Sequence, residues 1–259
     1  MSSLFERETL DRLQNWSIRG ISPYYGGSNY VFLVRLIDPE QQDNGVFVTG
    51  SEVIYAIYKP KAGERPLNDF PNGTLYRREK ASYVLSRELG WPRIPPTIIR
   101  EGPYGEGSFQ LFIKTAIAEN PSDRDPQNYF SLRDHRLNDF VDIAMFDVLS
   151  NNADRKAGAC IVDEQNTIWA IDHGLTFNQS ARRRTVMFEF NGLDYPVRLI
   201  KSVEELLKKL ASESVFRGYL LELLDSEEIR ELEIRGNEML DVGHYPILDP
   251  NINVPWPMV

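Results

Sequence analysis

Two aspartates carry most of the chemistry that this sequence could perform. Asp154 and Asp172 stand eighteen residues apart in the segment SNNADRKAGACIVDEQNTIWAIDHGLTF, residues 150–177. The short apolar runs at 159–162 and 167–171 predict a hairpin between them. Because a hairpin returns the chain to its starting point, we expect both carboxylates on adjacent loops. Phosphoryl transfer uses such a pair: one aspartate orients the attacking hydroxyl, and the other holds the metal bridging the nucleotide phosphates.

Small residues near these positions favour tight turns. Gly174 comes two residues after Asp172, and because glycine accepts unusual backbone angles we expect the chain to turn sharply there. Far upstream, Gly26, Gly27, Ser28 and Asn29 precede an apolar strand-like run. Their backbone N–H groups would be free to approach phosphates closely. A simple hairpin turn is the alternative interpretation of this second group.

The order of these features resembles a known family of kinases. Asn152-Ala-Asp-Arg and Ala170-Ile-Asp-His-Gly-Leu-Thr-Phe resemble the catalytic loop and the metal-binding motif of type II phosphatidylinositol 4-kinases. They are more similar still to the bacterial phosphatidylinositol 3-/4-kinase-like proteins, and HipA-like kinases share a related Asn-x-Asp-Arg loop. The resemblance implies an ATP- and Mg²⁺-dependent kinase with Asp154 as catalytic aspartate, Arg155 in the same catalytic loop, and Asp172 as metal ligand.

The first half of the chain supplies the matching parts. Lys59 ends the strand-like run AIYKPK, where the family places its ATP-binding lysine. Glu79 lies in a predicted helix over 75–89 and resembles the glutamate that pairs with that lysine. Such a pair holds the ammonium group over the nucleotide phosphates. The resemblance also gives the phosphate-covering turn to residues 26–29. The hydroxyl acceptor is left open between an inositol lipid, a small polyol and a protein.

One position departs from the family. The relatives carry a second metal ligand five residues after the catalytic aspartate, and this sequence has Ala159 there. Either Asp172 handles the metal with a neighbour such as Asn152, or activity is reduced or lost. The alternative function is therefore a pseudokinase that acts as a nucleotide-binding or interaction module.

A run of three arginines, Arg182, Arg183 and Arg184, follows Asp172 by about ten residues. The planar guanidinium groups of arginines bind phosphate and carboxylate groups well, so these residues could bind an anionic substrate. A solvated charged surface is the alternative. Cys160 is expected as a small buried residue, and His173 as a residue that fills the space between Asp172 and Gly174.

Composition narrows the class of protein. The 259 residues have a formal net charge of -9, which argues against a general nucleic-acid binder. One cysteine excludes an intramolecular disulfide. The N-terminal residues do not form a signal-peptide pattern, and the sequence has no run of about 18 apolar residues that would span a membrane. We therefore expect a cytoplasmic protein without a transmembrane segment.

The predicted elements indicate an α+β protein with two lobes and a cleft between them. The resemblance implies that this fold is protein-kinase-like and that the cleft binds ATP. A β-rich lobe over residues 1–116 would contact the nucleotide phosphates, and a mostly helical lobe over 117–259 would carry the catalytic loop and metal site. Strands are expected at 30–37, 53–58, 97–100, 108–114, 159–162 and 167–171. Helices are expected at 4–16, 75–89, 132–149, 203–210, 215–224 and 227–240.

Overall fold

The computed structural model describes residues 4–24, 29–43, 46–47, 52–115 and 127–259. Gly26, Gly27 and Ser28 lie outside the described residues. The chain forms two compact units: Met1–Tyr83 with Pro95–Ile113, and Val84–Ile94 with Lys114–Val259. Residues 84–94, which the sequence assigned to the first lobe, group with the second unit.

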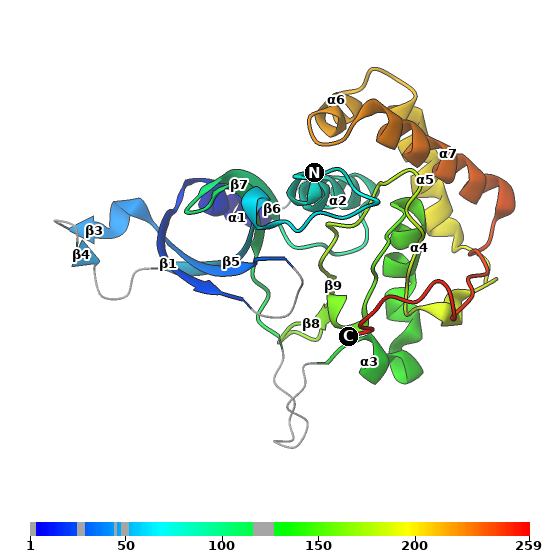
Figure 1. Ribbon diagram of the computed structural model, residues 1–259, viewed down its shortest axis with the longest axis horizontal. Helices are drawn as coiled ribbons and strands as arrows, with labels where there is room; N and C mark the ends of the chain where they lie inside the picture. Colours follow the sequence, from blue (N-terminus) through cyan, green and yellow to red (C-terminus); the bar gives the residue numbers. More distant parts are fainter. Residues whose placement is uncertain (1–3, 25–28, 44–45, 48–51, 116–126) are drawn as a thin grey trace. The chain divides into compact units, whose positions relative to one another are not determined.

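The first unit is built on a five-stranded antiparallel sheet with the strand order β1-β2-β5-β7-β6 (Figure 1). Its strands are β1 (Ser17–Pro23), β2 (Phe32–Ile37), β5 (Val53–Pro60), β6 (Thr97–Gly102) and β7 (Gly105–Leu111). A two-stranded ribbon of β3 (Gln42–Asp43) and β4 (Val46–Phe47) follows a 3-10 turn, η1 (Pro39–Gln41). The sequence did not predict β1, whose alternation is interrupted by an irregular pairing between Ile18 and Gly20.

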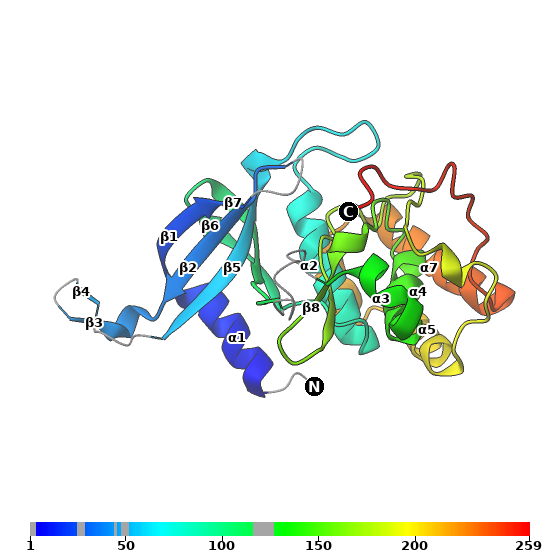
Figure 2. The ribbon, with the colours of Figure 1, turned by 90° about the horizontal axis from the view of Figure 1, so that it is seen from below.

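Helix α1 (Leu4–Asn15) packs on the sheet, and Figure 2 shows it crossing beneath the strands. Its Leu13 and the following Trp16 are buried against strand residues such as Val34 and Phe109. The helix predicted over 4–16 is present, but its apolar pattern holds only in part, because Glu6 and Thr9 are also buried while Leu4 is exposed.

Helix α2 (Leu75–Leu89) follows β5 after a 3-10 turn, η2 (Lys61–Gly63), and a longer connection. Its bounds are those predicted from the sequence. Its N-terminal part, through Tyr83, belongs to the first unit. The helix ends where Gly90 adopts a φ of 82°, a backbone angle that favours glycine.

The second unit is mostly helical. It contains α3 (Tyr129–Arg136), η3 (Leu137–Phe140), α4 (Val141–Leu149), η4 (Ala157–Ala159), η5 (Phe188–Phe190), α5 (Val197–Leu210), α6 (Val215–Leu221) and α7 (Ser226–Val242). The hairpin of β8 (Cys160–Val162) and β9 (Ile168–Ala170) connects the two loops that the sequence singled out. No helix among the described residues is long and apolar enough to cross a bilayer.

The single helix expected over 132–149 is wrong. The backbone leaves helical geometry at Arg136, with φ −132° and ψ 26°, and a 3-10 turn then leads into α4. The Arg136 side chain turns away from the helix to bond Asp139 and Asn166. Apolar spacing continues across the break, so periodicity alone could not reveal it.

Candidate active site

The loop that carries Asp154 is held by hydrogen bonds from its own asparagine. Asn152 is buried, and its amide nitrogen donates to Asp147 Oδ1 over 2.9 Å. Its amide oxygen accepts the backbone N–H of Asp154 over 2.9 Å. Both ends of this side chain are therefore used inside the loop, where they fix the backbone that presents the Asp154 carboxylate.

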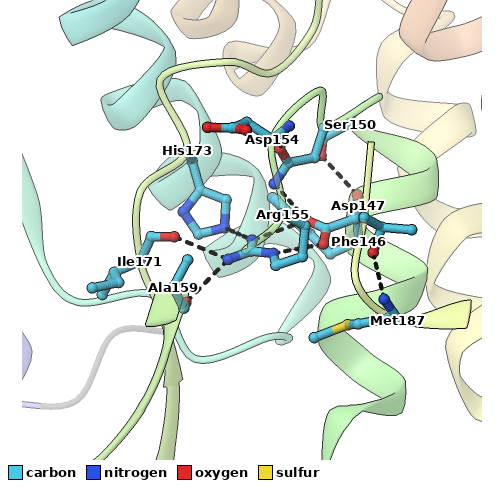
Figure 3. Close-up of polar contacts among 11 residues, drawn as sticks. Phe146, Asp147, Ser150, Asp154, Arg155, Ala159, Ile171, His173 and Met187 are labelled. Atoms are coloured by element: carbon cyan, nitrogen blue, oxygen red, sulfur yellow. Dashed lines mark hydrogen bonds and ion pairs between the residues drawn. The ribbon is translucent and has the colours of Figure 1, made fainter. Parts of the chain in front are cut away.

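Arg155, the next residue, lies at the centre of a buried ion pair (Figure 3). Its side chain is fully buried, and it donates from Nε to Asp147 Oδ2 over 2.7 Å and from Nη2 to Oδ1 over 2.9 Å. Burial opposes the charge, but the Asp147 carboxylate outweighs burial, so the pKa of Arg155 is raised. This bidentate geometry ties the loop to the last turns of α4.

The remaining donors of Arg155 join two further segments. Nη1 donates to the carbonyl oxygens of Ala159 and Ile171, both over 3.0 Å. Nη2 also lies 2.9 Å from Nε2 of His173, whose ring is buried edge-on to Phe146. Because an arginine cannot accept, Nε2 is the acceptor and the neutral ring carries its proton on Nδ1. One guanidinium group thus links α4, the turn before β8 and the segment after β9.

Asp172 lies two residues after the end of β9 and is exposed, unlike its buried neighbour His173. Its φ is +60°, in the left-handed region that an aspartate adopts more readily than most residues. The turn predicted at Gly174 is present at residues 174–175, just after this left-handed residue. Such a conformation is kept only where surrounding bonds fix it, as the Arg155 bond to the preceding Ile171 carbonyl does.

The two carboxylates share an electrostatic environment. Burial is the main cause that raises the pKa of Asp154, the ammonium group of Lys156 opposes it, and the Asp172 carboxylate raises it further. Lys156 Nζ lies 3.3 Å from Asp154 Oδ2. The hairpin therefore brings Asp154 and Asp172 together, as the sequence predicted.

Backbone hydrogen bonds join this loop to the chain after Asp172. Ala153 donates to the Leu175 carbonyl over 2.8 Å, and Arg155 donates to that of Arg184 over 2.9 Å. The C-terminal residues also contact this loop, because Ala157 donates to the Met258 carbonyl over 2.8 Å. Backbone hydrogen bonds therefore join the loop both to the segment after Asp172 and to the C-terminal residues.

Ala159 is buried, and its carbonyl oxygen accepts from both Arg155 and the backbone N–H of Ile171. Its methyl side chain has no lone pair for a metal. Asn152, which the sequence suggested as a substitute ligand, has both ends of its amide engaged in the loop. Neither residue adds a clear oxygen ligand beside Asp172.

The three arginines separate in the structure. Arg182 is exposed, whereas Arg183 turns inward and donates from Nη2 to the Val148 carbonyl at the end of α4. Arg184 lies near Asp154, and its charge acts on that carboxylate. Only Arg182 and Arg184 are thus left to meet an external anion.

The first unit brings Lys59 and Glu79 together. Lys59 Nζ donates to Glu79 Oε1, and the glutamate is almost fully buried in α2 while the lysine is partly exposed at the end of β5. Asn29 accepts the backbone N–H of Arg65 over 2.9 Å. The turn at 26–28 lies outside the described residues, so its predicted phosphate contact stays a prediction.

Asp147 is the residue that sequence analysis missed. It is the buried carboxylate that receives both Asn152 and Arg155. The signal was present: an aspartate near the end of the otherwise apolar run IAMFDVL, followed by an arginine eight residues later. A charge on the buried side of a helix requires a partner.

No family model matches the chain. A curated relative does: Protein Rv2133c of Mycobacterium tuberculosis (strain ATCC 25618 / H37Rv) is 33% identical over 239 residues, which cover 80% of this chain and 84% of that protein. The chain belongs to the Rv2133c family.

Comparison with solved structures shows that this member of the Rv2133c family has a protein-kinase-like fold. The Golgi casein kinase with Mn/ADP bound aligns with a TM-score of 0.53 and 15% identity, over 93% of this chain and 76% of that chain. The Helicobacter pylori proinflammatory kinase CtkA aligns with a TM-score of 0.50 and 11% identity, over 90% and 96% respectively. At these identities the likeness shows the fold alone. The predicted α+β, protein-kinase-like fold is confirmed.

Proposed function

We propose that the protein is an ATP-dependent phosphotransferase of the phosphatidylinositol 3-/4-kinase-like type, which moves the γ-phosphate of ATP to a hydroxyl acceptor. One observation carries the proposal: a single hydrogen-bonded assembly holds Asp154 and Asp172 close enough for each charge to act on the other. The kinase-like fold and the Lys59–Glu79 pair support it.

In this proposal each residue has a distinct role. Asp154 orients the acceptor hydroxyl and takes its proton, and Asp172 holds the metal. Lys59 binds nucleotide phosphates while Glu79 fixes its ammonium group. Asn152 and Arg155 act as positioning residues, because their polar atoms are turned toward the loops and not toward solvent.

The carboxylates of Asp154 and Asp172 suit Mg²⁺ better than a metal ion that takes all of its ligands from protein side chains. Among the described residues, no group of three or more His, Cys, Asp or Glu side chains converges. Mg²⁺ is usually held by one or two carboxylates together with water and substrate phosphates. Exposed Asp172 beside Asp154 provides that arrangement, and a cation there would relieve the repulsion between the carboxylates. When bound, the metal supplies charge neutralisation of the transferring phosphoryl group.

The test compares two aspartate variants with a matched control. Asp172→Ala should abolish the Mg²⁺ dependence of ATP binding measured by calorimetry. Asp154→Ala should keep that binding and lose ATP turnover, because its role arises only when an acceptor is oriented. Asp134→Ala, at an exposed position of α3, should behave as the parent. Parental turnover in both site variants would place the site elsewhere.

A pseudokinase is the second candidate, and Ala159 is the observation that favours it. With one metal ligand fewer, nucleotide binding could persist without transfer. Nucleotide-dependent thermal stabilisation, together with no ATP consumption under any acceptor tested, would support this second candidate.

A further inference from the structure

Helix α1 turns a carboxylate toward the inside of the first unit. Its buried residues are Glu6, Thr9 and Leu13, which recur at the spacing of one helical face. Leu13 packs in the apolar cluster between α1 and the sheet. Glu6 is only 7% exposed, and a glutamate is rarely buried to this extent without a partner. The position of Glu6 is therefore explained by what its carboxylate contacts.

Glu6 bonds a side chain of α2. Its Oε1 accepts the Tyr83 hydroxyl over 2.6 Å, a distance typical of a hydrogen bond from a hydroxyl to an ionised carboxylate. Tyr83 is buried as well. Because both groups are shielded from water, this bond fixes the two helices against each other more firmly than a contact at the surface would.

Lys80 adds a second polar contact at the same place. Its ammonium group donates to the Thr97 carbonyl of β6 over 2.7 Å and lies over the Tyr83 ring, 4.9 Å from the centroid. Burial lowers the pKa of Lys80 to about 8, and the Glu6 carboxylate opposes this change. The charges of Glu6 and Lys80 therefore act on each other inside the unit. Together these contacts join α2 both to α1 and to β6.

Glu79 lies between two attachments of α2 to the rest of the first unit. Tyr76, three residues earlier, bonds two carboxylates of this unit, one through its backbone and one through its hydroxyl. Tyr83, four residues later, bonds Glu6. Residues three and four positions apart are neighbours on a helix surface, so these two attachments bracket the carboxylate that pairs with Lys59.

We propose that Glu6 and Tyr83 are positioning residues for Lys59. Their hydrogen bond fixes the rotation and the axial position of α2 relative to α1. Helix α2 in turn holds the Glu79 carboxylate against the Lys59 ammonium group. The N-terminal helix thus sets where that ammonium group lies. This inference rests on the proposed function, because it matters for ATP only if Lys59 binds the nucleotide phosphates.

The first test measures ATP affinity by calorimetry with the full chain. Tyr83→Phe removes only the hydroxyl and Glu6→Leu removes the carboxylate, and each should weaken ATP binding by about 5-fold. Glu6→Gln keeps an oxygen that accepts the Tyr83 hydroxyl and should stay within about 2-fold of the parent. Thr9→Val is the matched control, because Thr9 is 5% exposed and Glu6 7%, and the Thr9 hydroxyl bonds the Phe5 carbonyl within α1. The control should bind ATP as the parent does.

A double-variant cycle separates a positioning role from a general loss of structure. In a Lys59→Met background the nucleotide no longer meets the ammonium group that Glu6 and Tyr83 place, so Tyr83→Phe should weaken ATP binding no further. The same loss in both backgrounds would overturn the proposal, because Tyr83 would then act by another route. Equal losses in Glu6→Gln and Glu6→Leu would overturn it too, since the glutamine amide keeps the hydrogen bond.

A nucleotide-free measurement tests the placement of Lys59 itself. Acetylation by an N-hydroxysuccinimide ester, followed by mass spectrometry, reports how fast each lysine reacts. Lys59 should react about 3-fold faster in Tyr83→Phe than in the parent, because a displaced Glu79 no longer holds the amine in its unreactive ammonium form. The exposed Lys208 should keep its rate. An unchanged rate at Lys59 would overturn the positioning role even in a protein that binds no ATP. A faster rate, with no ATP binding by the parent, would keep the positioning role and remove the proposed function.

Discussion

At the scale of single residues, the charges around Asp154 decide how it can act. Its carboxylate is partly buried and lies between the Lys156 ammonium group and the Asp172 carboxylate. Burial and the Asp172 carboxylate favour the protonated form of Asp154, whereas the Lys156 ammonium group favours the ionised form. A base with a raised pKa binds the acceptor's proton better, provided that it is still ionised at the working pH.

Lys156→Met should move the acidic limb of the pH–turnover profile to higher pH. The ammonium group lowers the pKa of Asp154, so its removal raises that pKa, and a higher pH is then needed to ionise the base. Profiles of kcat for the parent, Lys156→Met and the exposed control Lys208→Met would measure the shift. An unmoved limb in Lys156→Met would show that Asp154 is not the titrating base.

Ala159→Asn tests the position where the sequence departs from the pattern of the kinases that it resembles. An amide oxygen there would add a ligand for a second Mg²⁺, and that cation would bring more positive charge beside the transferring phosphoryl group. We expect slow turnover in the parent and a gain on the order of 10-fold, about 1.4 kcal/mol of barrier. Fast parental turnover without any gain would mean that another group already supplies the second ligand.

Lys59→Met should lower ATP affinity by about 10-fold or more while the fold is kept, because Lys59 is partly exposed at a strand end. Calorimetric titration with ATP measures the affinity, and circular dichroism checks the fold. Lys114→Met, at a highly exposed lysine, is the control and should leave affinity unchanged. Equal ATP affinity in a folded Lys59→Met protein would remove its assigned role.

At the scale of elements, the Asp147–Arg155 ion pair joins the loops around Asp154 to one another and to α4. Asp147 comes from α4, and Arg155 reaches the turn before β8, the end of β9 and the following segment. A buried pair of this kind contributes little net stability over apolar residues, yet removing one partner is costly. Its value here is that it fixes three segments in one arrangement.

Asp147→Asn should destabilise the second unit by on the order of 3 kcal/mol, because Arg155 stays buried without a full counter-charge. The double variant Asp147→Leu/Arg155→Met should recover much of that stability and still lose turnover. Denaturant unfolding and ATP turnover measure the two effects. As a control, Asp142→Asn breaks the more exposed pair with Arg198 and should cost about 0–1 kcal/mol. Full activity in the stable double variant would contradict a positioning role.

Sequence periodicity predicted those helices and strands whose apolar spacing and end signals lie within the element itself. The bounds of α2 match because apolar spacing and Gly90 both mark them. The break at Arg136 was missed since it depends on side chains distant in sequence, and β1 was missed because its alternation is irregular. Asp147 was missed for a related reason: its function appears only when Arg155 folds back onto it.

At the scale of the whole molecule, the order of parts along the chain was more informative than any part alone. The Lys59 strand, the Glu79 helix, the Asp154 loop and the Asp172 segment follow one another in the order expected from the resemblance to kinases, and comparisons show a kinase-like fold. The pairing of Lys59 with Glu79 could be expected from this order. The inward turn of Arg183 could not, because a run of arginines does not reveal which side chains will be buried.

The C-terminal residues have a practical consequence for anyone who prepares this protein. Asn253 bonds the chain on both sides of Arg184, and Val259 lies within van der Waals reach of a side chain placed at Gly158. An affinity tag fused after Val259 would begin beside the turn that precedes β8 and would crowd the loop holding Asp154. Low activity in a C-terminally tagged preparation would then reflect the tag, so activity should be measured after the tag is removed by a protease.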